Sequence, residues 1–498
     1  MLEELRQQFH RIAGHRGIRR YGANTLWMLA EKGCRLVFGF LVGIYVARQL
    51  GPARYGLLNY AISFVALFSV LATLGMDPVV VRELVRRPGK ANSILGSALG
   101  LKAAGFAVMA FVVGIVLLVS PMSDSDRGLM AVILAGYGFQ VFQIFDFSFQ
   151  ARVLGKYSAM SQIAALAVSS GFRLWFAWKG APLWCFAAVE SGYMALSAFG
   201  YALFYRKTGG CFRLWRFDRA EAAFLLRESL PLLLAGAAAM FYLRFDQVIV
   251  TWMLGDAANG QYAVAVRLVE VLFLVPLVVS DSFFPSLVGT RSTSLLRYYR
   301  RTEQLMRFMF YCALAILPPA AVAGYFLIVQ LYGAAYREAA WLFVFLLFKI
   351  LLVYPGLVYG KWYLAEGMQK ISMVVGICGC CTSVLLDYLM ILWWGGPGVA
   401  AAAVVTSTGL EAFVYDSVRE IIHLCGGTLE KEDALREYML ERVKDCLNGF
   451  SEAFEYDVEL EARLEPSPWP DYPLYLPNPK PLCLLAIPAA QLKEGSHG

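Results

Sequence analysis

Long apolar stretches alternate with short polar segments along most of this chain. A helix needs about 20 mostly apolar residues to cross the hydrocarbon core of a bilayer, and twelve stretches approach or exceed that length. They lie at residues 24–47, 56–74, 94–119, 129–149, 159–178, 182–205, 230–254, 262–284, 306–331, 339–360, 371–394 and 398–416. The pattern predicts an all-α polytopic membrane protein with about 12 transmembrane helices.

The basic residues between these spans are distributed very unequally. Without the C-terminal tail, the segments on the N-terminal side of the membrane carry 23 Lys and Arg, and the segments on the other side carry 5. Cytoplasmic loops are enriched in Lys and Arg. Successive loops lie on alternate sides of the membrane, so a missed span would mix the two counts. The count therefore predicts that both termini are cytoplasmic.

Composition agrees with a membrane protein and changes the meaning of the net charge. The 498 residues are 59% hydrophobic and 16% charged, with a mean hydropathy of +0.56, whereas soluble domains are roughly half apolar and about a quarter charged. A soluble enzyme and a disordered chain are excluded. The net charge of +7 combines an acidic tail at 417–498, with 15 Asp and Glu against 8 Lys and Arg, and a basic membrane part. It does not indicate a nucleic-acid partner.

The two halves of the membrane part share a short repeat. Residues 50–56 and 254–260 both read LGxAxxG and directly follow the first and the seventh span. Two similar six-helix halves with a substrate path between them are typical of transporters. The predicted organisation is a basic N-terminus at 1–23, six-helix bundles at 24–205 and 230–416, a cytoplasmic linker at 206–229 and a small soluble cytoplasmic tail at 417–498.

Several charges lie inside the predicted spans, where each costs on the order of 2.5–3.5 kcal/mol. Lys102, Arg244 and Lys349 have no opposite charge three or four positions away, whereas Arg35 and Arg267 have Glu31 and Glu270 at helical spacing and can form structural pairs. Cations in a cavity suit a phosphate group. The candidate substrate-binding residues are Arg35, Lys102, Arg244, Arg267 and Lys349.

Carboxylates in the spans are candidates for coupling to a proton or sodium gradient, since acidic residues in membranes commonly serve in relays. The candidates are Glu190, Asp246, Glu270 and Asp387. No metal or other cofactor is expected, because the chain has four His and no paired CxxC motifs. The Cys run at 378–381 is read as a packing face of small residues. A phosphate-binding loop and a nucleophile elbow are both missing from the sequence, which disfavours an enzyme.

Ordered segments of the chain resemble a known family. They are residues 24–32, 43–56, 74–83, 245–255, 260–270 and 284–285. Together they are similar to the polysaccharide repeat-unit flippases, of the O-antigen type, in the multidrug/oligosaccharidyl-lipid/polysaccharide exporter superfamily. The resemblance covers about residues 20–415 and does not include the tail.

The resemblance implies a fold, a cargo and partners. The fold would be two six-helix bundles, and the cargo an undecaprenyl-pyrophosphate-linked oligosaccharide, such as an O-antigen or capsule unit. The flippase would move it across the bacterial inner membrane by alternating access, driven by an ion gradient as in an antiporter. Implied partners are the lipid-linked oligosaccharide, membrane lipids, a polysaccharide polymerase and its chain-length machinery.

Other cargoes remain open at this point. The alternatives are a lipid II flippase and a drug/cation antiporter of the same superfamily. An antiporter for cationic drugs should have an acidic interior, and the spans hold nearly equal numbers of acidic and basic residues. A polytopic glycan polymerase or ligase is disfavoured because the predicted outward loops have about ten residues or fewer.

Overall fold

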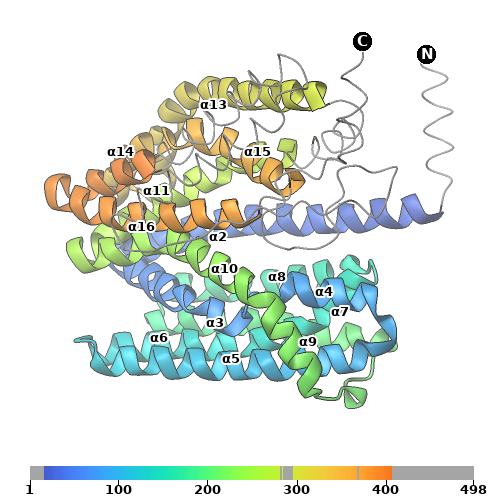
Figure 1. Ribbon diagram of the computed structural model, residues 1–498. Coiled ribbons are helices and arrows are strands. Elements are labelled where there is room, and N and C mark those ends of the chain that lie inside the picture. The colour runs from blue at the N-terminus through green and yellow to red at the C-terminus, as the bar shows by residue number, and fades with distance from the viewer. Residues whose placement is uncertain (1–15, 281–282, 284–294, 367–368, 407–498) are drawn as a thin grey trace, which may run out of the picture. The chain divides into compact units, whose positions relative to one another are not determined.

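The computed structural model describes residues 16–280, 283, 295–366 and 369–406, and every regular element in these ranges is a helix (Figure 1). Contacts divide the chain into two compact units. Unit 1 comprises the chain up to Val264 together with Leu327–Glu338, and unit 2 comprises Ala265–Phe326 and the chain from Ala339 onward. The predicted all-helical fold is confirmed.

The helices follow the predicted spans closely. The labelled α-helices are α2 (Arg16–Leu67), α3 (Ser69–Thr73), α4 (Asp77–Arg86), α5 (Ala91–Val119), α6 (Asp124–Tyr137), α7 (Ile144–Ala151), α8 (Gly155–Lys179), α9 (Leu183–Lys207), α10 (Arg219–Leu254), α11 (Asp256–Leu272), α13 (Leu295–Tyr332), α14 (Arg337–Leu347), α15 (Ile350–Glu366) and α16 (Gln369–Trp394). Residues 274–280 and Gly396–Thr406 are also helical. Short 3₁₀ turns are η1 (Pro88–Lys90), η2 (Gly138–Gln143), η3 (Phe212–Leu214) and η4 (Ala334–Tyr336).

Length and hydropathy alone identify fewer spans than the sequence pattern. Six of the described helices could cross a membrane on those grounds, or seven if α14 and α15 form one bent span. The difference has three sources. The single helix α2 contains the first two predicted spans, and α8 and α9 are long enough but too polar to pass the same test. Within the described residues, the last two predicted spans contribute only the shorter apolar helices Gly379–Trp394 and Gly396–Thr406.

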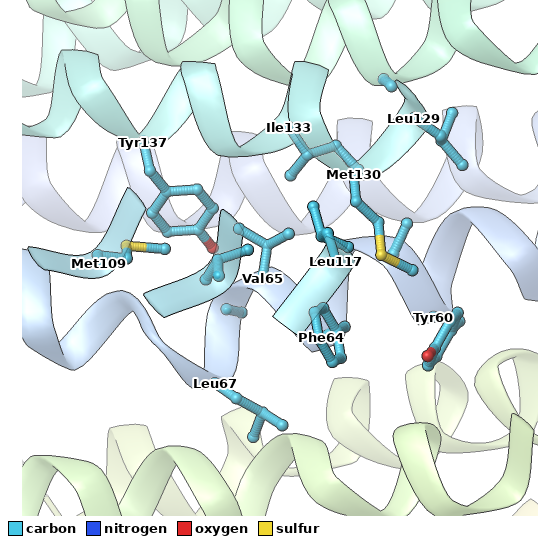
Figure 2. Packing of buried hydrophobic residues seen from close by; sticks show 14 of the residues in the cluster. Tyr60, Phe64, Val65, Leu67, Met109, Leu117, Leu129, Met130, Ile133 and Tyr137 are labelled. Atoms are coloured by element: carbon cyan, nitrogen blue, oxygen red, sulfur yellow. The ribbon is translucent and has the colours of Figure 1, made fainter. Parts of the chain in front are cut away.

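The interior of unit 1 is a tightly packed apolar cluster. In unit 1, α2 packs against α8 and α10, and α9 packs against α6 and α8. Figure 2 shows Phe64 and Val65 of α2 beside Leu117 of α5 and Met130 and Ile133 of α6. All five side chains are buried. Between spans in lipid, such packing supplies most of the attraction because there is little hydrophobic driving force.

The first two spans are joined by a very tight turn. Gly51 has φ 72° and ψ 169°, a conformation that L side chains rarely adopt. Pro52 follows at the start of the next helical segment, where the missing N–H costs no hydrogen bond. Gly255, the equivalent residue of the repeat, has nearly the same conformation with φ 88° and ψ 173°. The two copies of the repeat therefore share a backbone turn as well as a sequence.

The two copies also pack against each other within unit 1. A Cβ added to Gly56 would lie 1.8 Å from the carbonyl oxygen of Asp256, and one added to Gly260 would lie 2.0 Å from that of Pro52. The fully buried Asn259 side chain donates a hydrogen bond of 2.9 Å to the carbonyl oxygen of Gly56. Each copy thus uses its last glycine to admit the backbone of the other.

Replacing Gly56 by Ala is expected to lower the thermal stability of the purified protein, because the new methyl group would overlap the backbone of Asp256. Overpacking of this kind costs about 1–3 kcal/mol. Gly114→Ala in α5 is the matched control, since nothing lies within 4 Å of an added Cβ there and alanine favours a helix. The apparent midpoint of thermal unfolding should fall for Gly56→Ala and stay level or rise for Gly114→Ala. Equal midpoints would contradict the close contact.

Two predicted spans are interrupted helices. Span four consists of α6, the 3₁₀ turn η2 and α7. Span ten consists of α14 and α15, which meet at Phe348 and Lys349 with a bend of 51°. Interrupted helices within a membrane protein are often found at functional positions.

The domain prediction is only partly comparable with these units. The contact units assign α10 and the start of α11 to unit 1, whereas the predicted second bundle begins at residue 230. The two six-helix bundles stay a prediction. The tail at 417–498, most of the N-terminal segment 1–23 and residues 407–416 of the last span lie outside the described residues.

Candidate functional site

A group of charged and polar side chains connects α2, α8 and α9 inside unit 1. Arg35 of α2 forms an ion pair of 2.6 Å with Glu31, one turn earlier, and donates a hydrogen bond to Gln162 of α8. Tyr193 of α9 lies close enough to Arg35 and Glu31 for electrostatic interaction. The helical spacing predicted a Glu31–Arg35 pair, and the structure contains it. The Arg35 side chain remains half-exposed.

A second pair continues this group toward α10. Arg173 of α8 forms a hydrogen-bonded ion pair with Glu190 of α9. The charges of Glu190 and of Arg244, from α10, both act on the buried Tyr137 of α6. Glu190 also interacts electrostatically with Tyr193. We call Glu31, Arg35, Tyr137, Arg173, Glu190, Tyr193 and Arg244 the unit 1 polar cluster.

Arg244 differs from the other two cations of the unit 1 polar cluster. Its side chain is half-buried, yet within the described parts of the chain it makes neither a hydrogen bond nor an ion pair. Glu190 is already bound to Arg173. A partly desolvated guanidinium with five donors and no carboxylate partner is well suited to bind an anion from outside the chain.

Asp246 lies two residues further along α10 and has partners of its own. Its carboxylate accepts a hydrogen bond of 2.6 Å from the hydroxyl of Tyr262 in α11 and one of 2.8 Å from the backbone N–H of Gln247. The next residue, Gln247, is buried and accepts a hydrogen bond from Ser63 of α2. These hydrogen bonds join α10 to α11 and to α2.

Lys102 is the most deeply buried cation among the described residues of unit 1, with 1% of its side chain exposed. Its ammonium group lies 3.0 Å from a carboxylate oxygen of Asp77 in α4 and 4.5 Å from the ring centre of Phe147 in α7. The carboxylate of Asp146, which accepts hydrogen bonds from Ser158 and Gln150, is near enough to interact with both charges. Lys102 therefore has a counter-charge, which local spacing could not reveal.

The candidate residues of unit 2 occupy unlike positions. Lys349 is half-buried at the bend between α14 and α15, where its carbonyl oxygen accepts the first hydrogen bonds of the second helical segment. Arg267 is half-buried on α11. Glu270 is exposed, and its side chain forms no ion pair or hydrogen bond among the residues described, so the predicted pair with Arg267 is not formed.

Asp387 is the most buried carboxylate among the candidates. Only 2% of it is exposed, and one of its oxygens accepts a hydrogen bond of 3.4 Å from Ser383, one turn earlier on α16. Asp387 therefore lies inside the packing of the chain and not at its surface.

Sequence reasoning missed the partners that come from distant helices. Asp77 and Glu190 were both visible as polar residues, but their pairing with Lys102 and Arg173 depends on how the helices pack. The sequence also predicted no role for Arg82 of α4. Partial burial lowers the pKa of Arg82, yet hydrogen bonds and charges of Glu228 and Glu83 outweigh it and raise that pKa overall.

Comparisons with known proteins agree with the fold. The sequence profile of the family described as "polysaccharide biosynthesis protein" matches residues 21–289, more than half of the chain. The chain belongs to this family. No curated protein sequence matches it significantly.

Solved structures of the same fold are transporters. An inward-facing multidrug resistance MATE transporter of the MOP superfamily has a TM-score of 0.65 at 15% identity, with 80% of this chain and 96% of that chain covered. The lipid II flippase MurJ in its inward closed conformation has a TM-score of 0.61 at 11% identity, with 86% and 99% covered. A MOP superfamily transporter from Pyrococcus furiosus has a TM-score of 0.53 at 13% identity, covering 82% and 96%. The chain is thus a multi-pass membrane protein with the fold of this superfamily.

Proposed function

We propose that this chain is a flippase that moves an undecaprenyl-pyrophosphate-linked oligosaccharide repeat unit, of the O-antigen type, across the bacterial inner membrane for cell-surface polysaccharide assembly. Membership of a polysaccharide biosynthesis family supports the glycan part of the cargo. The likeness in fold to a lipid II flippase supports a lipid-linked cargo. The role is transport and not catalysis, and both termini are cytoplasmic.

The observation that carries the proposal is the state of Arg244. A half-buried guanidinium without a hydrogen bond or ion pair in the described chain is costly in a spanning helix. A pyrophosphate would supply the missing charge and accept bidentate hydrogen bonds. In unit 2, Lys349 lies at the bend of an interrupted span, the kind of position at which transporters bind ions and anionic groups. We propose that Arg244, assisted by Arg35, binds phosphate oxygens in unit 1, and that Lys349, assisted by Arg267, binds them in unit 2.

Lys102 is less suited to binding phosphate oxygens. Its ammonium group is buried and paired with Asp77, so a phosphate would have to displace that carboxylate. We propose that Lys102 acts mainly by holding α5 against α4.

Ion coupling is assigned to carboxylates in the spans. Asp246, Glu190 and Asp387 are at least half-buried and hydrogen-bonded, whereas Glu270 is exposed. Asp246 is the best candidate because the hydroxyl of Tyr262 can retain its hydrogen bond to either protonation state. Alternating access of the two halves would then carry the cargo across.

Asp246→Asn is expected to abolish gradient-driven accumulation of cargo in one leaflet while leaving exchange without a gradient largely intact, because the amide cannot take up a proton. Asp246→Glu retains the acid and serves as the control. Accumulation is measured in vesicles with an imposed pH or sodium gradient. Full accumulation by Asp246→Asn would remove this residue from the coupling step.

A binding experiment separates the proposed cargo from the alternatives. A transporter of Pyrococcus furiosus with this fold is described as having a binding pocket of reverse polarity that suggests a different function, so the fold alone does not decide the cargo. The purified chain should bind the pyrophosphate-linked oligosaccharide at least tenfold more tightly than the same lipid without phosphate, and more tightly than lipid II or a cationic drug. Preference for lipid II or for the drug would establish an alternative and overturn the proposal.

A further inference from the structure

The segment between α9 and α10, residues 206–219, has an unusual combination of charge and exposure. We call it the linker platform. It has one carboxylate, Asp218, and five basic residues, all of them exposed. The five are Arg206, Lys207, Arg213, Arg216 and Arg219. None of the five forms an ion pair with any residue that the structure describes, so their charges are not neutralised within that part of the chain.

The neighbouring basic residues in α4, in η1 and between them behave differently. Arg87 and Lys90 both bind the buried carboxylate of Glu221, at 2.8 and 3.1 Å. Arg82 binds Glu228, also on α10, at 2.9 Å. These cations hold α4 and η1 against α10. The basic residues that hold helices together are paired with carboxylates. The five basic residues of the linker platform are not paired in this way, so they do not hold helices together.

Apolar side chains are exposed between the cations of the linker platform. Phe212 is 48% exposed and Leu214 is 58% exposed, on the short turn η3. Exposed aromatic and aliphatic groups that alternate with Arg and Lys are typical of segments lying in the interface between lipid headgroups and water.

The backbone of the linker platform is held in place. The indole N–H of Trp215 donates a hydrogen bond of 3.0 Å to the hydroxyl of Tyr205, near the end of α9. The backbone N–H of Asp218 donates one of 2.9 Å to the hydroxyl of Ser97 in α5. The sixth predicted span ends at residue 205, so the contact with Tyr205 places the platform at the membrane surface and not far out in water.

We propose that the linker platform binds the headgroups of acidic phospholipids. The guanidinium groups match phosphate oxygens, and a membrane leaflet with acidic lipids attracts clustered cations next to a span. The exposed apolar side chains would enter the acyl boundary beside those headgroups. This inference does not depend on which cargo the chain carries.

Native mass spectrometry of the purified full-length chain with phosphatidylglycerol and phosphatidylcholine tests the proposal. The wild type is expected to retain phosphatidylglycerol over phosphatidylcholine. The triple variant Arg213→Gln/Arg216→Gln/Arg219→Gln should retain phosphatidylglycerol at least tenfold more weakly. The matched triple variant with Lys at the same positions should retain it nearly as well as the wild type. Equal retention by the Gln and Lys variants, or no lipid preference in the wild type, would overturn the proposal.

A photo-crosslink identifies the occupant of the platform even if the Gln variant folds poorly. With p-benzoylphenylalanine in place of Phe212, irradiation in vesicles containing phosphatidylglycerol should give a lipid adduct. An adduct to the acidic residues 417–498 would instead show that the platform binds the chain's own tail and would overturn the lipid assignment. Release of the lipid by inorganic pyrophosphate, but not by chloride of equal ionic strength, would assign the cations to a soluble phosphate and also overturn it.

Discussion

Replacement of Arg244 or Lys349 by alanine should reduce translocation of a pyrophosphate-linked oligosaccharide by roughly 10- to 150-fold each. Hydrogen bonds to a charged group contribute about 1.5–3 kcal/mol, and each 1.4 kcal/mol corresponds to about a factor of ten. Arg244 has no hydrogen bond or ion pair within the described chain, so its loss removes little internal stability. A reduced rate would therefore report a loss of cargo binding and not a loss of folding.

Two control variants on α10 accompany this prediction. Arg244→Lys keeps the charge but loses bidentate geometry, so it should lose less activity than Arg244→Ala. Arg227→Ala, on the exposed surface of α10, should translocate at the wild-type rate. If the Arg244→Ala and Lys349→Ala variants, alone and combined, are as fast as wild type, the phosphate-binding assignment is wrong.

Asp77→Asn should lower the stability of the protein by about 1–3 kcal/mol, since Lys102 is buried although Asp77 itself is 43% exposed. The substitution leaves the ammonium of Lys102, of which 1% is exposed, without the charge that pairs with it. Removing the partner is costly because the buried Lys102 then remains charged in a poorly solvated place. The apparent midpoint of thermal unfolding and the yield of monodisperse protein measure the effect.

A double variant separates the structural role of Lys102 from a role in cargo binding. Asp77→Asn/Lys102→Met removes both charges and should regain most of the stability, since a neutral side chain of similar length replaces the lysine. If Lys102 only holds α5 against α4, the double variant should also translocate cargo. A stable double variant that does not translocate would place Lys102 in the cargo site.

Much of the fold was predictable because apolar length and glycine turns are local properties. The run from 24 to 47, the Gly51-Pro52 turn and the repeat at Gly255 follow from neighbouring residues, and the structure contains all of them. The bend at Lys349 was not predictable, since no glycine or proline lies at Phe348–Lys349 and Pro355 is further along.

The charged pairs were only partly predictable. Glu31 and Arg35 share one helix, so their spacing was sufficient. Arg267 and Glu270 have a similar spacing but do not pair with each other in the described part of the structure. The partners of Lys102 and Arg173 come from other helices, and sequence from one chain carries no information on which helices meet. The candidate site therefore required the packing of α4, α8 and α9.

The central claim is that this chain moves a lipid-linked oligosaccharide through its pyrophosphate. The most direct measurement is the rate at which an undecaprenyl-pyrophosphate-linked oligosaccharide, placed in one leaflet of vesicles, becomes accessible in the other. The wild-type chain should accelerate this rate over protein-free vesicles, and Arg244→Ala/Lys349→Ala should return it to the protein-free value. A wild-type rate equal to that of protein-free vesicles would contradict the account.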